Sequence, residues 1–502
     1  MRRLFTLLFI AVTAIAARAT DFNVPITVTV NGVSSEQTAI ITIVENGGLY
    51  DLNLKNFVLQ TENGPMGVGN VELKGITSFQ DGNATLLMAS DQVTITDGDD
   101  PNIAFWMASM LPPVPVELRG KIEGDRLRCF IDIDLMATSL QQVIQVGIGG
   151  GYQLPNASFE AWHSTTDSYV EPNSWHSFES ASGMLAALAG HHIEKSAEAH
   201  SGVASARIFA TSIFGIVANG TMTTGRMNAG SMSAVDVVNN AYLDMSLTDV
   251  DGHGDPFYTP LYSCPDSIAV WVKFNQGTPN AAHPYATISA VITDGTYYQD
   301  PEDKAYANVV AKAKDNRIAT TGGEWVRISA PFVYTESGID PQAVLVTIST
   351  NADAGQGSAN DEVLVDDIAL IYNAKVTHLK VKGHDVAGFS PETTDYEMEL
   401  NEQVTANDLE VEVDGKTAHV IKKVEAQDGY YVCTIVAISA DMSTLSTYVV
   451  RVKSNATAIS HLQTTASQPT YYTLDGRQAK TLVPGQLYVC RQPDGKMAKV
   501  HW

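Results

Sequence analysis

The stretch Ile26-Thr27-Val28-Thr29-Val30, followed directly by Asn31-Gly32, decides the fold class of this chain. Apolar and polar side chains alternate strictly in it, which is the period of a β-strand with one buried face. The Asn-Gly pair tolerates the positive φ that a tight hairpin turn needs. The same alternation recurs at 267–274 and 344–348, so the sequence predicts a mainly β protein.

Helix signals are few by comparison. The strongest begins at Asp300-Pro301-Glu302-Asp303, which offers a cap, a first-turn proline and two acids. Apolar residues follow at helical spacing from Tyr306 to Ala313, so a helix is predicted there. A shorter apolar piece at 184–189 predicts one or two helical turns.

The first nineteen residues have the pattern of a secretory signal peptide. Arg2 and Arg3 precede an apolar stretch from Leu4 to Ala17, and Ala17-Arg18-Ala19 is a small-x-small cleavage site before Thr20. The apolar stretch is too short to span a bilayer, and no later one is long enough for a transmembrane segment. We therefore expect a secreted or cell-surface protein.

Charge and cysteine usage exclude some function classes. The net charge of −25 disfavours nucleic acid and anionic membrane surfaces as partners. The four cysteines, Cys129, Cys264, Cys433 and Cys490, lie far apart in different segments, so no disulfide framework is expected. Stability should then come from packed cores, with structural calcium as an added candidate.

Composition shifts divide the chain into four parts after the signal. A glycine run at 147–151 ends the first segment, 20–150, and an apolar strand at 368–373 ends the second, 151–374. The third is 375–454, and a Ser/Thr/Asn/Ala-rich linker opens the last, 455–502.

Residues 20–150 resemble the calycin-like, lipocalin-like domain of exported Bacteroidetes proteins. The motifs that carry the resemblance lie at 49–57, 68–71, 115–121 and 130–134. The resemblance implies an antiparallel barrel, which either holds one small apolar ligand or is filled by its own side chains.

Residues 151–374 resemble the family named "putative carbohydrate metabolism domain" of Bacteroidetes. Six motifs in order carry this resemblance: 156–162, 171–175, 200–208, 220–226, 264–274 and 363–372. The segment is more distantly similar to jelly-roll carbohydrate-binding modules. The resemblance implies a jelly-roll β-sandwich and a carbohydrate-related role.

Strand alternation offers a candidate glycan platform. In 267–274 the aliphatic residues share one face, and Trp271 and Lys273 share the other; Trp325 and Arg327 are placed likewise opposite Val326 and Ile328. Indole stacks on the apolar face of a sugar, and a cation beside it binds hydroxyls. Trp162 and Trp175 are further candidates. The alternative is that these tryptophans pack under loops.

Three carboxylates form a candidate metal site. Glu160 lies at the start of the jelly-roll segment, and Asp366 and Asp367 lie at its end. First and last strands of a jelly roll often pair, which would bring these oxygens together as calcium ligands. In the modules that this segment resembles, that location often holds a structural calcium. The alternative is a solvated or arginine-paired acidic edge.

Two further polar clusters are expected to be solvated. The stretch from Asp249 to Asp255 is similar to a calcium loop but has Pro260 where an EF-hand has Glu. His191, His192, Glu194, Glu198 and His200 have no recognised ligand spacing. No nucleophile elbow, zinc-protease motif or phosphate loop occurs, so the catalytic residues, if any, stay unknown.

The last two parts resemble bacterial surface modules. Residues 375–454 resemble a small immunoglobulin-like or cadherin-like β-sandwich, and 471–502 are similar to the short C-terminal β tail that serves as a sorting signal in Bacteroidetes.

The leading hypothesis is an exported, non-catalytic protein that binds a glycan or polysaccharide on the central jelly roll. One alternative is a glycoside hydrolase or related enzyme on the same domain. The other is a structural or adhesive surface protein whose partner is another protein.

Overall fold

The computed structural model describes residues 18–30, 33–61, 64–136, 141–165, 168–336, 338–427, 429–454, 470–472, 487–491 and 497–501. The predicted signal peptide lies outside this part except for Arg18 and Ala19, as do the predicted linker and most of the tail. The chain divides into two compact units. One comprises 1–376, 413–421 and 437–446, and the other 377–412, 422–436 and 447–502.

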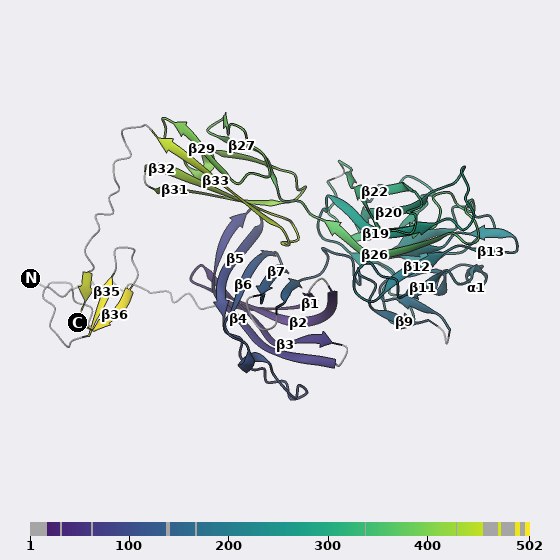
Figure 1. Ribbon diagram of the computed structural model, residues 1–502, viewed down its shortest axis with the longest axis horizontal. Helices are drawn as coiled ribbons and strands as arrows, with labels where there is room; N and C mark the ends of the chain where they lie inside the picture. The colour runs from purple at the N-terminus through teal and green to yellow at the C-terminus, as the bar shows by residue number, and fades with distance from the viewer. Residues whose placement is uncertain are drawn as a thin grey trace, which may run out of the picture. The chain divides into compact units, whose positions relative to one another are not determined.

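Eight antiparallel strands close into a barrel at the start of the first unit (Figure 1, purple to blue). They are β1 (Arg18–Val30), β2 (Val33–Asn46), β3 (Leu49–Thr61), β4 (Gly64–Asp81), β5 (Ala84–Val93), β6 (Val114–Glu123), β7 (Arg126–Asp134) and β8 (Val143–Ile148). The predicted strand at 26–30 lies in β1, where Ile26 and Val28 are buried. It pairs with β2 on one side and closes the barrel against β8 on the other.

The barrel interior is packed with its own aliphatic side chains. Ile26, Ile41, Leu52, Leu73 and Leu118 are each at most 2% exposed and belong to one buried cluster. An eight-stranded barrel has an interior just wide enough for side chains to fill. The sequence left open whether the barrel holds a small apolar ligand or is filled by its own side chains. At these positions the structure shows filling by side chains.

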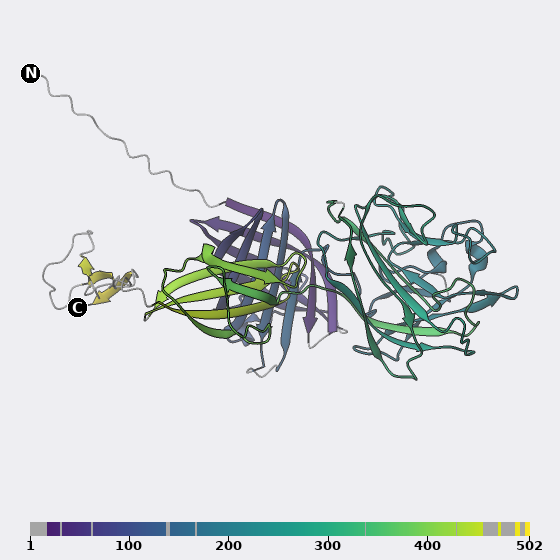
Figure 2. The ribbon, with the colours of Figure 1, turned by 90° about the horizontal axis from the view of Figure 1, so that it is seen from above.

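Two antiparallel sheets follow the barrel and form a sandwich (teal to green in Figures 1 and 2). The five-stranded sheet has the order β11 (Ile193–Ser196), β12 (Ser205–Phe209), β26 (Glu362–Ile371), β19 (Ser267–Asn275) and β23 (Val326–Pro331). The six-stranded sheet has the order β15 (Thr221–Thr223), β25 (Ala343–Ser349), β20 (Ala286–Thr293), β22 (Val309–Ile318) and β24 (Val333–Tyr334), with β18 (Thr259–Pro260) paired to β25. Aliphatic side chains of both sheets share one buried cluster.

Smaller elements lie around the two sheets. They are a three-stranded sheet of β16 (Arg226–Asn228), β17 (Asn240–Leu243) and β21 (Tyr298–Asp300), the hairpins β9 (Trp162–Ser164) with β10 (Val170–Pro172) and β13 (Thr211–Ile213) with β14 (Ile216–Ala218), the helix α1 (Ala186–Ala189), and the 3-10 turn η2 (Phe178–Ser180). Met227 and Leu243 of the three-stranded sheet share a buried cluster with Val291 and Leu345 of the six-stranded sheet. The smaller sheet therefore covers part of the outer face of the larger one.

The helix predicted after Asp300 is wrong. Residues 298–300 form β21, and 309–318 form β22. Ala311 and Ala313 are buried in β22 while Lys312 and Lys314 are exposed, so the stretch also has the period of a strand. Its pairing with β20 settles an ambiguity that local spacing cannot. The short helix predicted at 184–189 is confirmed in part by α1.

The strands after residue 375 form three sheets. The first joins β28 (His384–Asp385), β27 (Val376–Val381) and β30 (Leu409–Val413). The second joins β29 (Asp395–Leu400), β33 (Leu445–Ser454), β32 (Tyr430–Ile438) and β31 (His419–Gln427), with β29 parallel to β33. The third joins β34 (Thr470–Tyr472), β35 (Leu487–Arg491) and β36 (Met497–His501). The mainly β prediction is therefore confirmed.

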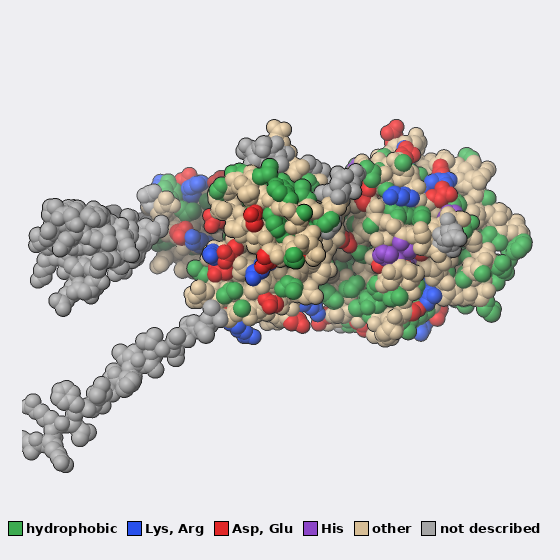
Figure 3. Space-filling model, turned by 90° about the horizontal axis from the view of Figure 1, so that it is seen from below, with side chains coloured by type: hydrophobic (Ala, Val, Ile, Leu, Met, Phe, Trp, Pro, Cys, Tyr) green, Lys and Arg blue, Asp and Glu red, His purple; other side chains and the backbone are tan. Residues whose placement is uncertain are grey.

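Charged side chains are dispersed over the surface. On the face drawn in Figure 3, acidic and basic side chains stand among apolar and uncharged ones. None of the helices in the described part of the chain is long and apolar enough to cross a membrane.

Candidate functional site

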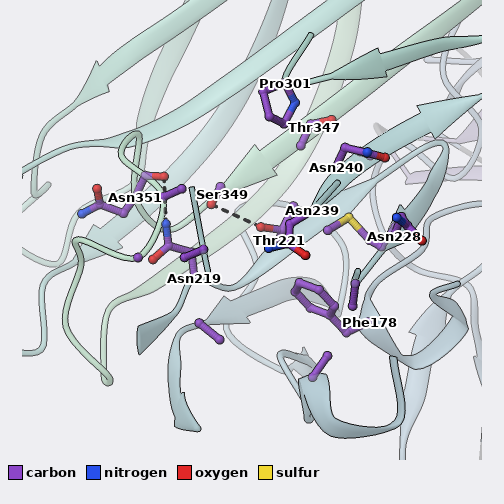
Figure 4. Close-up of a pocket in the computed structure, with 18 of the residues that line it drawn as sticks. Phe178, Asn219, Thr221, Asn228, Asn239, Asn240, Pro301, Thr347, Ser349 and Asn351 are labelled. Atoms are coloured by element: carbon purple, nitrogen blue, oxygen red, sulfur yellow. Dashed lines mark hydrogen bonds between the residues drawn. The ribbon is translucent and has the colours of Figure 1, made fainter. Parts of the chain in front are cut away.

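A cavity of about 310 Å³ lies on the outer face of the six-stranded sheet (Figure 4). Thr221, Ser349 and Thr287 form one row of its floor, because these residues pair across β15, β25 and β20. Thr347 and Ser289 form the next row. The floor therefore presents hydroxyl groups, each of which can donate and accept a hydrogen bond.

The sequences of β20 and β25 explain why only part of this face is polar. Leu345 pairs with Val291, and both are buried under the three-stranded sheet. Two residues further along each strand, on the same face, the pair becomes Thr347 with Ser289. The aliphatic cover ends where the hydroxyl-bearing rows begin. Sequence reasoning missed this site, although hydroxyls at alternate positions of two apolar strands are a readable signal.

The walls of the cavity combine apolar side chains with amides. The apolar lining includes Phe178, Leu185, Leu188, Ile213, Ile216 and Met232, and the amide lining includes Asn219, Asn228, Asn239, Asn240 and Asn351. Asn239 holds the 229–239 loop in place, because its Oδ1 accepts from the N–H groups of Gly230 and Ser231. Its Nδ2 donates to the carbonyls of Ser231 and Ser233.

Three oxygens of lining residues have no hydrogen-bond partner among the described residues. They are Thr287 Oγ1, Asn219 Oδ1 and Asn240 Oδ1, and all three are shielded from solvent. An unpaired buried oxygen costs free energy, of the order of 1–3 kcal/mol. A ligand that donates hydrogen bonds at these walls, after a small side-chain rotation, would remove that cost.

The cavity has few ionisable groups. Among its described lining residues, Asp300 is the one carboxylate and Lys314 the one cation. Glycoside hydrolysis ordinarily needs two carboxylates on either side of the scissile bond. The described lining therefore supplies one of the two carboxylates that such a reaction needs.

The predicted alternation of β19 is confirmed. Val270 and Val272 are at most 1% exposed, whereas Trp271 and Lys273 are half-buried on the outer face of the five-stranded sheet. Arg327 pairs with Trp271 in the neighbouring strand β23. Trp325 lies just before that strand and is half-buried. The four predicted platform residues of 271–273 and 325–327 are thus brought together.

Neighbouring side chains already occupy this platform. The ring of His200 stacks on Trp271 with centroids 3.9 Å apart, and meets Trp325 edge-on at 6.0 Å. Lys273 is paired with Glu198. One face of the Trp271 indole and the nearest cation are therefore unavailable to a sugar as the side chains stand.

Two expectations about individual side chains are wrong. Trp175 is fully buried in the core against Phe159, and donates to the carbonyl of Pro155, so it offers no surface to a ligand. Val326 pairs with the buried Val272 and so lies on the core face, but it is 39% exposed at the start of β23, so its expected burial is wrong. Trp162 is half-buried and packs against the core, with its Nε1 donating to the Phe159 carbonyl.

The three carboxylates predicted as calcium ligands surround one loop, residues 198–204. Glu160 accepts from the N–H groups of Val203 and Ala204. Asp366 accepts from the N–H groups of His200 and Ser201. Their approach follows from pairing of the first and last segments, since Ile368 N–H donates to the Ala157 carbonyl. Calcium binding there stays a prediction.

The two aspartates differ in environment. Asp366 is fully buried, and burial, with Asp367 beside it, raises the pKa of its carboxyl to about 6. Asp367 is 25% exposed and bonds the ring Nδ1 of His200 at 2.6 Å and the hydroxyl of Ser201 at 2.9 Å. Asp366 therefore lies beside Trp271 on the outer face of the five-stranded sheet, buried under the 198–204 loop, whereas Asp367 is partly exposed.

The histidine cluster at 191–200 does not form one site. His192 is fully buried, with its ring nitrogens against the carbonyls of Phe209 and Ala189, so the expected solvated turn is wrong there. His191 lies 3.1 Å from Glu179, and His200 belongs to the Trp271 platform.

The 249–255 loop was expected to be solvated, and this is wrong at Asp251. The Asp251 side chain is 1% exposed. Its Oδ1 accepts from the N–H groups of His253, Gly254 and Asp255, so the loop wraps around its own carboxylate. Its Oδ2 faces His163 and His176.

Comparisons with known proteins bear on the barrel and little else. None of the curated proteins matches this sequence. A putative glycoside hydrolase from Bacteroides thetaiotaomicron is 13% identical over 59% of this chain and 92% of its own, with a TM-score of 0.33. Carbohydrate-binding modules of the beta-sandwich superfamily are 6% identical over 69% of this chain and 97% of theirs, with a TM-score of 0.20. These similarities are too low to assign an activity. Residues 19–150 match the model of the calycin-like beta-barrel domain, in agreement with the closed barrel that they form.

Proposed function

We propose that this protein binds the end of a glycan chain in the cavity on the six-stranded sheet. The observation that carries the proposal is the floor of paired hydroxyls, with Thr221, Ser349 and Thr287 in one row and Thr347 and Ser289 in the next. A sugar presents hydroxyls that donate and accept, together with apolar C–H faces. The cavity offers matching hydroxyls on its floor, and amides and apolar side chains on its walls.

The size of the cavity favours a short ligand. Its volume of about 310 Å³ is at the lower end of the range for small-molecule pockets. A terminal sugar or short branch suits this space better than a long stretch of polysaccharide, which needs an open groove.

Non-catalytic binding is the version of this proposal that the lining supports. Hydrolysis would need a second carboxylate across from Asp300, and the described lining supplies none. The signal peptide motif at 1–19 supports export, and calcium at Glu160, Asp366 and Asp367 belongs to the proposal as a structural ion.

A glycan array probed with the full-length protein tests the proposal. Thr347→Phe places a ring in the cavity, and Trp271→Ala removes the alternative platform on the other sheet. Circular dichroism verifies that both variants fold. Binding by the wild type that Thr347→Phe abolishes and Trp271→Ala preserves is the expected result.

Other outcomes point elsewhere. The reverse pattern would move the site to the Trp271 face. Release of sugar from a bound glycan would favour the hydrolase. A folded wild type that binds nothing on the array would leave the adhesive alternative, with a protein partner.

A further inference from the structure

Four buried ligand atoms lie in one cluster beside the β9–β10 hairpin, three of them close to one another and the fourth next to Asp251. They are Nε2 of His163 in β9, Oε2 of Glu171 in β10, Nδ1 of His176 and Oδ2 of Asp251. None of the four has a hydrogen-bond partner among the described residues. Glu171 and His176 are fully buried, and the side chains of His163 and Asp251 are 7% and 1% exposed. Such groups are rarely left unpaired inside a protein, so this cluster needs an explanation.

The ligand atoms of His163, Glu171 and Asp251 are close enough together to share a metal ion, and His176 adjoins Asp251. His163 Nε2 and His176 Nδ1 lie 3.4 Å and 3.5 Å from Asp251 Oδ2. The ligand atoms of His163, Glu171 and Asp251 all lie within 4.8 Å of one another. Four ligands at about 2.0–2.2 Å around a tetrahedral ion are about 3.3–3.6 Å apart. The two N···O separations fall in that interval, and are long for a direct hydrogen bond.

The far sides of the two imidazoles fix their orientation. His163 Nδ1 lies 3.1 Å from Oδ1 of Asn173, and His176 Nε2 lies 3.3 Å from the carbonyl of Pro256. When those nitrogens carry the protons, the lone pairs of the other two nitrogens point at Asp251. Metal-bound histidines ordinarily donate their second N–H in this way.

Glu171 and Asp251 have no lysine or arginine partner among the described residues. The second oxygen of each is already held: Glu171 Oε1 accepts from Ser177 and Ser180, and Asp251 Oδ1 accepts from its own loop. Each carboxylate is therefore anchored by one oxygen and leaves the other for a ligand. Two buried carboxylates without a counter-charge are costly to fold.

We propose that His163, His176, Glu171 and Asp251 bind a first-row divalent cation of the zinc class. Two imidazoles and two carboxylates form a mixed nitrogen and oxygen donor set, which suits zinc and its neighbours. Calcium prefers six to eight oxygen ligands and is not matched here.

The cation would tie together segments that are distant in sequence. The ligands come from β9, from β10, from the turn after it and from the 249–255 loop. His253 stacks on His163 at 4.8 Å, and with Asp255 forms a second group of ligand atoms around His163 that is more open to solvent. This rim offers a route for the ion to enter. Phe178 of the cavity wall follows His176 by two residues, so the ion would also brace that wall.

Calorimetric titration of the metal-stripped full-length protein with zinc chloride tests this inference. The wild type should bind one zinc ion, and calcium should bind there much more weakly. His163→Ala and Asp251→Asn should abolish binding. Asn173→Ala should weaken it about 10–100-fold, because Asn173 only orients a ligand. His283→Ala is the matched control, since His283 is paired with Asp353 at another place on the surface and should bind zinc like the wild type.

Cobalt substitution of the wild type keeps the test decisive if a variant fails to fold. Cobalt in a four-coordinate site of this kind gives an intense visible absorption band that zinc removes on addition. That band, together with zinc binding lost in folded His163→Ala, supports the site. A wild type that binds no zinc, a folded His163→Ala with unchanged affinity, or bound cobalt without the band would each overturn it. Neither result depends on whether the cavity binds glycan.

Discussion

The two outer faces of the central sandwich differ in how far their polar groups are satisfied. On the five-stranded sheet, Trp271 is covered by His200, Lys273 is paired with Glu198, and Asp366 accepts from backbone N–H groups. On the six-stranded sheet, Thr287 and Asn240 leave oxygens without partners beside a cavity. The tryptophan and lysine of the first face suggest a sugar-binding platform from the sequence. The unpaired oxygens of the second face are visible only in the structure.

A ligand gains more free energy from the six-stranded face than from the five-stranded face. A face whose groups already bond one another must lose those contacts before it binds anything. A face that leaves acceptors unpaired carries a cost that a ligand can remove. The free energy of unfolding should therefore respond in opposite directions to mutations on the two faces.

The largest effect belongs to the core that both faces share. Trp175→Ala should lower the free energy of unfolding by about 3–5 kcal/mol, because a fully buried indole is lost and a cavity is left. Urea denaturation measures the change. A loss below about 1 kcal/mol would mean that the packing of the two sheets does not depend on this core. Stability changes on the two outer faces could then not be compared within one cooperative unit.

On the five-stranded face, Asp366→Ala should cost about 1–3 kcal/mol. It leaves the N–H groups of His200 and Ser201 without their acceptor. Because the pKa of Asp366 is raised to about 6 in the folded protein, this carboxyl contributes most below its unfolded pKa and loses that contribution as pH rises toward 6. The cost should then be larger near pH 4 than near pH 7. Equal costs at the two pH values, from denaturation curves, would contradict this account.

On the six-stranded face, Thr287→Val should stabilise the protein by about 0.5–1 kcal/mol, since the mutation removes an unpaired buried hydroxyl and keeps the shape. If the cavity binds glycan, the same variant should bind about 2- to 10-fold more weakly. Thermal unfolding and calorimetry measure the two changes. Ser201→Ala, which removes a hydroxyl bonded to Asp367, is the matched control and should destabilise. If both variants changed the free energy of unfolding in the same direction, the proposed difference between the two faces would be wrong.

The smallest effect is expected at Lys273. Its ion pair with Glu198 joins a partly exposed cation to a carboxylate that is 57% exposed, and such pairs contribute little. Lys273→Ala should therefore change the free energy of unfolding by less than about 1 kcal/mol in chemical denaturation. A larger loss would show that the Lys273–Glu198 ion pair is needed to keep the 198–204 loop in contact with Glu160 and Asp366.

Alternation along single strands was readable from the sequence, and it placed Ile26, Val270 and Trp271 on the correct faces. Residues 300–313 show its limit, because their spacing fits a helix as well as the strand that β20 imposes. Val326 shows another, since it lies on the core face at the start of β23 yet is exposed, while Ala330 of the same strand is buried.

The two sites that the structure adds depend on contacts across long stretches of chain. The cavity floor joins Thr221 to Ser349, and the cation cluster joins His163 to Asp251. The spacing of residues along the chain does not show which distant residues pair. The carboxylates at 160 and 366–367 were anticipated only because paired first and last strands could be assumed from the resemblance.

Closure of the barrel has a consequence for shortened forms of the chain. Strand β1 pairs with β8 as well as with β2, so no strand of the closed barrel presents a free edge. A polypeptide that ends before Val143 lacks β8 and leaves unpaired backbone groups at 26–30 of β1 and 129–134 of β7. Such a fragment is a template for intermolecular strand pairing. Translation or degradation that stops short of this point should therefore yield aggregates, whereas a nick in a hairpin turn leaves every strand in place.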